Sequence, residues 1–368
     1  MSNAVYMDYN ASVPIRPEAA SAVASALSVG GNPSSVHGHG RAARRLIEDA
    51  REQVAAAIGA PAAAIVFTSG ATEANALALR GSGRARILVS AIEHDSVRQA
   101  VPNAEIVPVT PAGQVDLAAL AAMLAGDSRP ALVSLMLANN ETGVVQPVAE
   151  ATRLAHAHGA LIHSDAVQAV GRIVVDVNNL GADLLSLSAH KLGGPVGVGA
   201  LYRREGVALA PQLLGGGQER SQRAGTENVA GIAGFGAAAA LVSGDLEKVG
   251  RLADLRDELK KRIVAAAPHA VLFGATVQRL PNTVYVALPG IAAETQIMAL
   301  DLAGVSVSAG AACSSGKVKI SAVLSAMGAS ADLARSAIRI SLGWASRESD
   351  IDRFMAAWTG LSARSLAA

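Results

Sequence analysis

The sequence predicts an α/β protein with a mostly parallel seven-stranded sheet and a smaller α+β domain. Over residues 64–202, strand-like apolar runs alternate with helical stretches, which is the pattern of a parallel sheet covered on both faces. The apolar residues are mostly Ala, Val and Leu, and only 3% of the chain is aromatic, which suits helices packed closely on a sheet. Near residue 250 the composition changes from an alanine-rich to a highly charged helix. In a chain of 368 residues we therefore expect a large domain over residues 15–250 and a small one made of residues 1–14 and 251–368.

The first elements are a short strand and two helices. A strand is expected at residues 5–8 and a small helix at 17–29. Residues 30–40 contain too many Gly, Pro and Ser for regular structure, so they should form a connector or a ligand-lining loop. An apolar stripe predicts an amphipathic helix over 41–58, which Gly59 ends.

Later elements follow the same signals of apolar periodicity and turn residues. Strands of the sheet are expected at 64–67, 86–90, 106–109, 131–137, 161–164, 182–187 and 199–202. Helices are expected at 73–79, 117–124, 148–158, 229–242 and 246–263, with an irregular loop at 215–226. The small domain should add strands at 283–287, 305–308 and 337–341.

The bulk properties exclude several classes of protein. A formal net charge of +1 without a basic block gives no reason to expect a nucleic-acid partner. Cys313 is the only cysteine, so no disulfide can form within the chain, and we expect a cytoplasmic protein. The start, MSNAVYMDYN, lacks the charged and apolar regions of a signal peptide. Residues 229–242 are too few and too rich in Gly and Ala to span a bilayer, so we expect a buried helix and no membrane partner.

Residues 182–195 hold the first candidate for chemistry. Their apolar run ends in a polar, glycine-rich turn that carries Ser188, His190 and Lys191. In α/β proteins, active sites lie just beyond the carboxyl ends of strands, and a lysine there can form a Schiff base with a carbonyl cofactor. A surface lysine after a strand is the commoner reading of an isolated lysine.

Three other strand ends carry residues suited to a cofactor. The helix start within residues 68–75, with the Thr72 hydroxyl, could cradle a phosphate, although Ser or Thr with a nearby Glu is also an ordinary helix cap. Asp165 could cap the next helix or pair with a protonated ring nitrogen, and Gln168 could bind a ring oxygen. His94 could be structural, or could stack on a flat ring and move protons.

The fourth candidate is Cys313. Most free cysteines are small buried hydrophobes, but this one lies in a loop of very small residues. Lys317 and Lys319 follow closely, and their charge favours the thiolate. We therefore expect a mobile, accessible and reactive cysteine.

Taken together, these segments resemble the cysteine desulfurases, pyridoxal-phosphate enzymes of the class-V aminotransferase family. The resemblance runs from residue 7 to about residue 358, and its motifs lie at residues 31–34, 67–73, 139–146, 163–168, 186–191, 215–220, 223–228 and 337–343. It implies the aspartate aminotransferase-like fold, known as fold type I.

The resemblance also implies roles for single residues. Lys191 would hold pyridoxal 5′-phosphate, Asp165 would pair with the ring nitrogen, and Gln168 would contact the ring oxygen. The catalytic groups would be Lys191, Cys313 and His94, with His94 stacked on the ring. The other cofactor contacts would come from Gly70, Ala71, Thr72, Ser188, His190 and, from the other subunit of a homodimer, Thr226. The substrate would be bound by Arg339, Asn140 and Asn32.

The implied reaction converts L-cysteine to L-alanine and leaves the sulfur on Cys313 as a persulfide, for an acceptor protein. The residues after Cys313 resemble the iron–sulfur-assembly type with a longer mobile loop, because the Arg-x-Gly-His-His-Cys pattern of the other type is absent from the sequence. No metal site is expected. A selenocysteine lyase, a class-V aminotransferase and a catalytically silent sulfur-transfer partner remain as alternatives.

Overall fold

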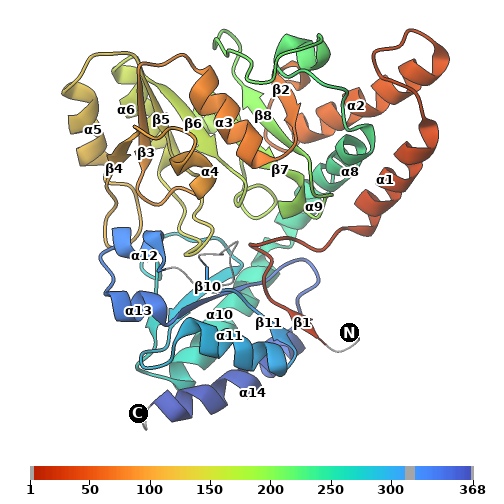
Figure 1. Ribbon diagram of the computed structural model, residues 1–368. Coiled ribbons are helices and arrows are strands. Elements are labelled where there is room, and N and C mark those ends of the chain that lie inside the picture. Colours follow the sequence, from red (N-terminus) through yellow and green to blue (C-terminus); the bar gives the residue numbers. More distant parts are fainter. Residues whose placement is uncertain (1–3, 311–319, 366–368) are drawn as a thin grey trace.

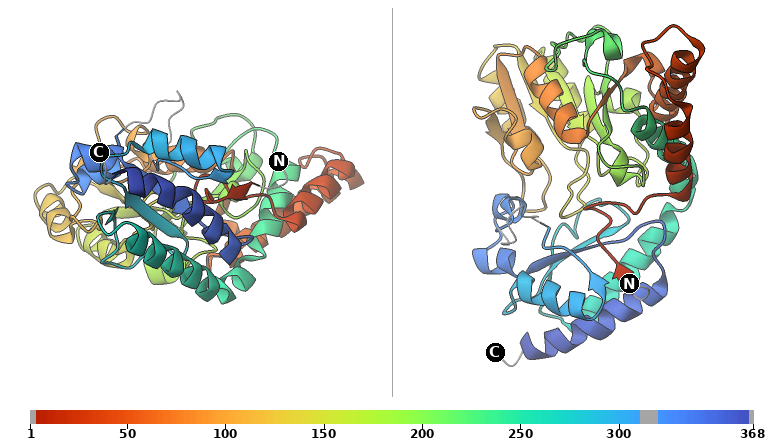
Figure 2. Two further views of the ribbon diagram at one scale, coloured as in Figure 1. Left: turned by 90° about the horizontal axis from the view of Figure 1, so that it is seen from below. Right: turned by 45° about the vertical axis from the view of Figure 1, so that its right-hand side comes forward.

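A computed structural model describes residues 4–310 and 320–365, so Cys313, Lys317 and Lys319 lie outside the described residues. A seven-stranded sheet with its helices forms one part of the molecule, and two smaller sheets with their helices form the other (Figure 1). The N-terminal strand lies in the smaller part, and the chain then crosses to the larger one (Figures 1 and 2).

The large sheet confirms the predicted α/β class. Its strand order is β2-β8-β7-β6-β5-β3-β4, and β8 runs antiparallel to both of its neighbours while the pairs from β7 to β4 are parallel. The strands are β2 (Ile65–Thr68), β3 (Arg86–Ser90), β4 (Glu105–Val107), β5 (Ala131–Ser134), β6 (Leu161–Asp165), β7 (Leu184–Ser188) and β8 (Gly199–Arg203).

Helices cover both faces of this sheet because alternate strand residues point to opposite sides. Leu185 of β7 packs in the larger cluster, with α1, α2, α5, α6 and α8, whereas its neighbour Leu184 packs with α3 and α4. The helices of this part are α1 (Pro17–Val29), α2 (Gly38–Ala56), α3 (Ala71–Gly81), α4 (Asp95–Arg98), α5 (Leu117–Ala125), α6 (Val148–Ala157), α7 (Val177–Leu180), α8 (Val229–Ala239) and α9 (Val242–Glu247). Single 3₁₀ turns form η1 (Ala62–Ala64) and η2 (Ala189–Lys191), whereas the turn η3 (Gln218–Ser221) contains residues with positive φ.

The smaller part contains an antiparallel sheet and a parallel pair of strands. β10 (Thr283–Ala287) lies between β9 (Val271–Leu272) and β12 (Ala337–Ser341), and β1 (Val5–Tyr6) pairs with β11 (Val305–Ser306). A separate apolar cluster joins these strands to the helices α10 (Val249–Ala266), α11 (Ala293–Leu302) and α14 (Glu348–Ser365).

The two parts meet through a mixed apolar cluster. Ile92 and Met136 from the large part pack with Tyr285 of β10 and with the helices α12 (Ala322–Ala326) and α13 (Ala331–Arg335). Polar contacts reinforce this junction, since the side chain of Asn10 bonds to the main-chain oxygen of Asn140 (3.1 Å) and to the Thr283 hydroxyl (2.9 Å). The strand ends of the large sheet are thereby held against β10 and β12.

Several predicted boundaries differ from the observed ones. The predicted helix at 246–263 is two helices, because the chain leaves helical geometry at Lys248. The helix predicted from residue 41 begins at Gly38, where the His37 ring caps its first turn. β5 ends at Ser134, but the N–H groups of Leu135 and Leu137 still bond to the chain of β6, so the apolar run predicted to residue 137 stays extended.

The apolar helix α8 forms part of the core. Residues Val229–Glu247 have a mean hydropathy of 1.6 and enough length to cross a membrane, by composition alone. In the structure this stretch is divided into α8 and α9, and α8 packs against α1 and α2. Small residues such as Gly236 permit this close approach, because a Cβ atom there would lie 2.6 Å from the Cα atom of Ala50.

Candidate active site

A cavity of about 1000 Å³ lies beside the carboxyl ends of the parallel strands, where β12 approaches them. It is lined by eleven of the predicted residues: Gly70, Ala71, Thr72, His94, Asn140, Asp165, Gln168, Ser188, His190, Lys191 and Arg339. Its size suits a small organic ligand. The fold therefore brings together residues that are far apart in the sequence, from Gly70 to Arg339.

Lys191 ends the turn η2 directly after β7. Its Nζ atom donates to the main-chain oxygens of Asn10 (2.5 Å) and Ala11 (2.9 Å). Burial, followed by the charges of Arg339 and Arg172, lowers the pKa of Lys191 from its ordinary value of 10.5 to about 7. A large fraction of this amine is thus unprotonated near neutral pH, the form that attacks a carbonyl carbon.

Gln168 is held by Arg172, a residue that the sequence analysis did not select. Arg172 is 7% exposed and donates to the main-chain and side-chain oxygens of Gln168 and to the main-chain oxygen of Tyr9. An arginine can only donate, so the Gln168 carbonyl must face it, and the Gln168 amide nitrogen faces Asn10. Arg172 therefore fixes which end of the Gln168 amide is available at the cavity.

Asp165 is 8% exposed and accepts two hydrogen bonds. One comes from the main-chain nitrogen of Val167 (3.0 Å), and the other comes from the Asn75 side chain (2.9 Å). The residues after Asp165 form a turn and not a helix, so the predicted alternative that Asp165 caps the next helix is wrong. Asn75 also donates to Ser96, whose hydroxyl lies 2.8 Å from Nδ1 of His94. This chain of polar contacts links Asp165 to the ring of His94.

The link through Asn75 and Ser96 was missed in the sequence. Spacing offered a signal for Asn75, because it lies three residues after Thr72 and so on the same face of α3. His94 caps α4, because its Nδ1 atom accepts from the main-chain nitrogen of Ser96 (3.1 Å). His94 can therefore cap α4 and line the cavity at the same time.

The start of α3 offers main-chain donors to the cavity. Its N-cap is Gly70, which has no side chain to occupy the first-turn N–H groups of Ala71 and Thr72. The Glu73 carboxylate accepts a hydrogen bond from the main-chain nitrogen of Ser69 (2.9 Å) and also binds Arg223. The prediction that a nearby Glu helps to cap this helix is therefore partly correct. The open helix start, beside Ser188 and His190, suits a phosphate group.

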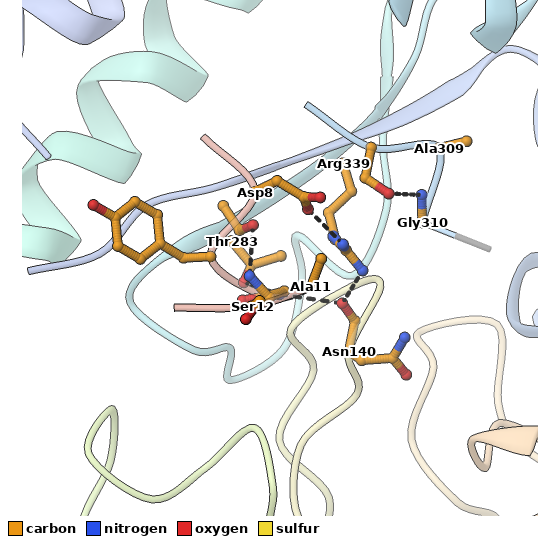
Figure 3. Close-up of polar contacts among 12 residues, drawn as sticks. Asp8, Ala11, Ser12, Asn140, Thr283, Ala309, Gly310 and Arg339 are labelled. Atoms are coloured by element: carbon orange, nitrogen blue, oxygen red, sulfur yellow. Dashed lines mark hydrogen bonds and ion pairs between the residues drawn. The ribbon is translucent and has the colours of Figure 1, made fainter. Parts of the chain in front are cut away.

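Arg339 enters the cavity from β12 and is 2% exposed. Nη2 contacts Oδ1 of Asp8 at 2.7 Å, and Nη1 donates to the main-chain oxygen of Asn140 at 3.0 Å (Figure 3). The Asn140 side chain points away from the guanidinium, so Asn140 supports Arg339 through its main chain (Figure 3). The buried Nε atom has no hydrogen-bond partner among the described residues, which leaves a donor for a ligand carboxylate.

Two buried carboxyl groups beside the cavity were also missed. Burial raises the pKa of Glu93 well above its usual range; its Oε1 accepts from Met136, and its Oε2 has no partner in the described part of the chain. Burial also raises the pKa of Glu141, which accepts from the hydroxyls of Tyr285 (3.1 Å) and Ser321 (2.5 Å). Their positions next to His94 and Asn140 in the sequence were the available signals.

The remaining predicted residues lie elsewhere. Asn32 is exposed in the loop before α2, where it accepts from the main-chain nitrogen of Ser34, and it does not line the cavity of its own chain. Thr226 is exposed too and is likewise absent from that lining. Cys313 lies outside the described residues. In the described ranges, no group of three or more His, Cys, Asp or Glu side chains could hold a metal ion.

The loop that carries Thr226 is anchored by a buried ion pair. Arg51 binds Glu219 at 2.7 Å, and Glu219 also accepts from the main-chain nitrogen of Phe67 (2.8 Å). These contacts hold Glu219 in left-handed geometry (φ 44°), which costs a residue with a side chain on the order of 1–3 kcal/mol. The loop is therefore fixed against the large sheet.

Comparisons with known proteins find similar sequences and similar structures along nearly the whole chain. The aminotransferase class-V family profile matches residues 5–354. A cysteine desulfurase of Cereibacter sphaeroides is 45% identical over 95% of this chain and 94% of its own. A NifS-like protein from Rickettsia africae has a similar structure, with a TM-score of 0.91, 36% identity and coverage of 98% of this chain and 99% of that one. SspA, solved in complex with cysteine, has a TM-score of 0.78 and 28% identity, over 92% of this chain and 98% of that one.

The matches extend along almost the whole chain. The cavity also contains the lysine, aspartate and arginine that the resemblance predicted. This chain therefore belongs to the aminotransferase class-V family, in the group of the cysteine desulfurases.

Proposed function

We propose that this protein is a pyridoxal 5′-phosphate-dependent cysteine desulfurase, which converts L-cysteine to L-alanine and passes the sulfur to Cys313. The observation that carries the proposal is the convergence of Lys191, Asp165 and Arg339 on one cavity. The relatives named cysteine desulfurase support the same activity.

The residues present fit the cofactor. The open start of α3 would hold its phosphate, Asp165 its ring nitrogen, and Gln168 its ring oxygen. Lys191 has the lowered pKa that covalent attachment to a carbonyl requires. When bound, pyridoxal phosphate supplies an electron sink for the pair released at the substrate Cα atom.

Side chains of the protein would bind the substrate, move the Cα proton and accept the sulfur. Arg339 would bind the substrate carboxylate through its free donors, and Lys191 would take the Cα proton once the substrate has displaced it. The Cys313 thiolate would attack Sγ of the substrate, so that an S–S bond forms and the Cβ–Sγ bond breaks. The electron pair of the broken bond stays with the carbon skeleton, which would take up one proton at Cβ, regain one at Cα and leave as alanine.

We further propose that the protein acts as a cytoplasmic homodimer and gives its persulfide to an acceptor protein, for iron–sulfur assembly or another sulfur-containing cofactor. The exposed position of Thr226, outside the cavity of its own chain, is consistent with a contact to the partner's site. The anchored loop described above would hold Thr226 in place for that contact.

A persulfide assay tests the proposal. Purified protein with bound cofactor should form alanine from L-cysteine, and Cys313 should gain one sulfur atom, as measured by mass spectrometry. A Cys313→Ser variant should keep the visible cofactor absorption but lose sulfide release in the presence of a thiol. A wild-type protein that forms no alanine would contradict the proposal, and amino transfer to a keto acid would favour the aminotransferase alternative.

A further inference from the structure

The N-terminal segment 8–12 contacts three of the functional side chains, although it carries no predicted site residue. Lys191 donates to the main chain of Asn10 and Ala11, Gln168 donates to Asn10, and Arg339 binds the Asp8 carboxylate. Of these segment residues, Asn10 and Ala11 line the cavity whereas Asp8 does not. Asp8 must therefore act through Arg339, rather than by touching a ligand.

The contact between Asp8 and Arg339 occupies only part of the guanidinium. Oδ1 of Asp8 contacts Nη2, and the main-chain oxygen of Asn140 occupies one donor of Nη1 (Figure 3). The Nε proton and one proton on each Nη atom remain free of these two contacts, and Nε is buried without a partner among the described residues. A ligand carboxylate can thus bind Arg339 while Asp8 stays in place.

Asp8 is held in place by contacts of its main chain with neighbouring residues. Its carbonyl oxygen accepts from the Tyr6 hydroxyl (3.0 Å) and from the nitrogen of Ala11 (3.0 Å), and the residue forms a parallel bridge with Ser341 of β12. Its side chain is 19% exposed, against 3% for Arg339. A fixed carboxylate outside the cavity is suited to orienting the buried guanidinium of Arg339, which lines the cavity.

We propose that Asp8 is a positioning residue of the substrate site, whose carboxylate holds Arg339 in the orientation that binds the substrate α-carboxylate. This inference rests on the proposed function, in which Arg339 binds that carboxylate. The opposite hypothesis, that Asp8 competes with the substrate for Arg339, predicts the opposite change in affinity.

The test measures binding of L-alanine to the cofactor-loaded protein by the change in visible absorption, beside the KM and kcat for L-cysteine. Asp8→Ala should weaken L-alanine binding and raise KM by about tenfold, because the oriented charge-assisted hydrogen bond is lost. We expect kcat to change less than KM and the cofactor absorption without ligand to stay the same. Asp8→Asn should restore most of the affinity, since its amide oxygen can still accept from Nη2.

Tyr6→Phe is the matched control, because it removes a contact to the Asp8 main chain and leaves the carboxylate intact. It should bind L-alanine within about twofold of the wild type. Unchanged or tighter binding in Asp8→Ala overturns the inference in favour of competition. Equal losses in Asp8→Ala and Asp8→Asn, or in Asp8→Ala and Tyr6→Phe, also overturn it. A wild-type protein that neither binds L-alanine nor forms it overturns the proposed function itself.

Discussion

The protonation of Lys191 is the property of a single residue on which the site depends most. An exposed lysine is almost fully charged at neutral pH, whereas burial beside two arginines makes the charged form of Lys191 unfavourable. Both of its hydrogen-bond partners are main-chain oxygens, which are weaker partners for an ammonium group than a carboxylate would be. Position in the fold, and not the residue type, thus lowers the pKa of this lysine.

This environment predicts the pH dependence of cofactor uptake. In cofactor-free protein, the rate at which pyridoxal phosphate attaches should rise with pH and reach half its maximum near pH 7, because only the neutral amine attacks the carbonyl carbon. The rate should fall as pH drops through 7, since the amine then gains a proton. Stopped-flow absorbance from pH 5.5 to 10 measures it, with Lys191→Ala as the control that should show no slow absorbance change. A rate that still increases steeply between pH 8.5 and 10 would contradict the lowered pKa.

At the scale of elements, the proposed phosphate cradle depends on how closely β8 and the start of α3 pack. A Cβ atom on Gly199 of β8 would lie 2.6 Å from the main-chain oxygen of Leu187 and 2.7 Å from the Cα atom of Gly70. Both neighbours are main-chain atoms, so neither can move without shifting β7 or the N-cap of α3. The small residue in β8 is therefore part of what shapes the cavity.

Gly199→Ala should weaken cofactor binding, because it displaces Gly70 and the main-chain donors that follow. We expect a loss of stability of about 1–3 kcal/mol from overpacking and a higher Kd for pyridoxal phosphate. Denaturant unfolding and fluorescence titration of the cofactor-free protein measure the two effects. Gly244→Ala in α9 is the control, because a Cβ atom there meets no heavy atom within 4 Å. Cofactor affinity in Gly199→Ala equal to that of the control would show that the cradle tolerates the shift.

At the scale of the whole molecule, one buried histidine joins three strands of the large sheet. His163 of β6 is 0% exposed, and its ring nitrogens lie 2.8 Å from the Ser134 hydroxyl in β5 and 2.9 Å from the Ser186 hydroxyl in β7. Each nitrogen of the neutral ring therefore has a partner. Burial lowers the pKa of His163 from its ordinary value of 6.5 to about 4.

His163 should make global stability depend on pH in the acid range. Its folded pKa lies below its unfolded pKa, so the unfolded chain binds a proton first as pH falls below 6.5. The associated stability is complete above about pH 6.5 and is lost down to about pH 4, with a total of about 3 kcal/mol.

Urea unfolding at pH 7 and pH 5 measures this dependence. His163→Gln removes the titrating group and keeps a polar side chain between the two serines, so its stability should fall less between the two pH values than that of the wild type. Equal losses in both proteins would assign the acid sensitivity to other groups.

The sequence alone determined the fold class and supplied eleven of the residues that line the cavity. Apolar runs and the polar turns after them are local signals, so they located β6, β7 and the candidates Asp165 and Lys191 at the strand ends. Parallel strands place their carboxyl ends on one edge, which explains why candidates from separate segments share a cavity. The ordered motifs supported the family, which the comparisons confirmed.

Only the tertiary structure decided how the site residues are held. Asp8 and Arg339 are more than 300 positions apart in the sequence, and no local pattern pairs them. The roles of Arg172 and Asn75 likewise follow from which group each one faces across the fold. Local preferences fix strands, helices and turns, but contacts between distant segments depend on how the elements pack, and that packing places Asp8 behind Arg339 and lowers the pKa of Lys191.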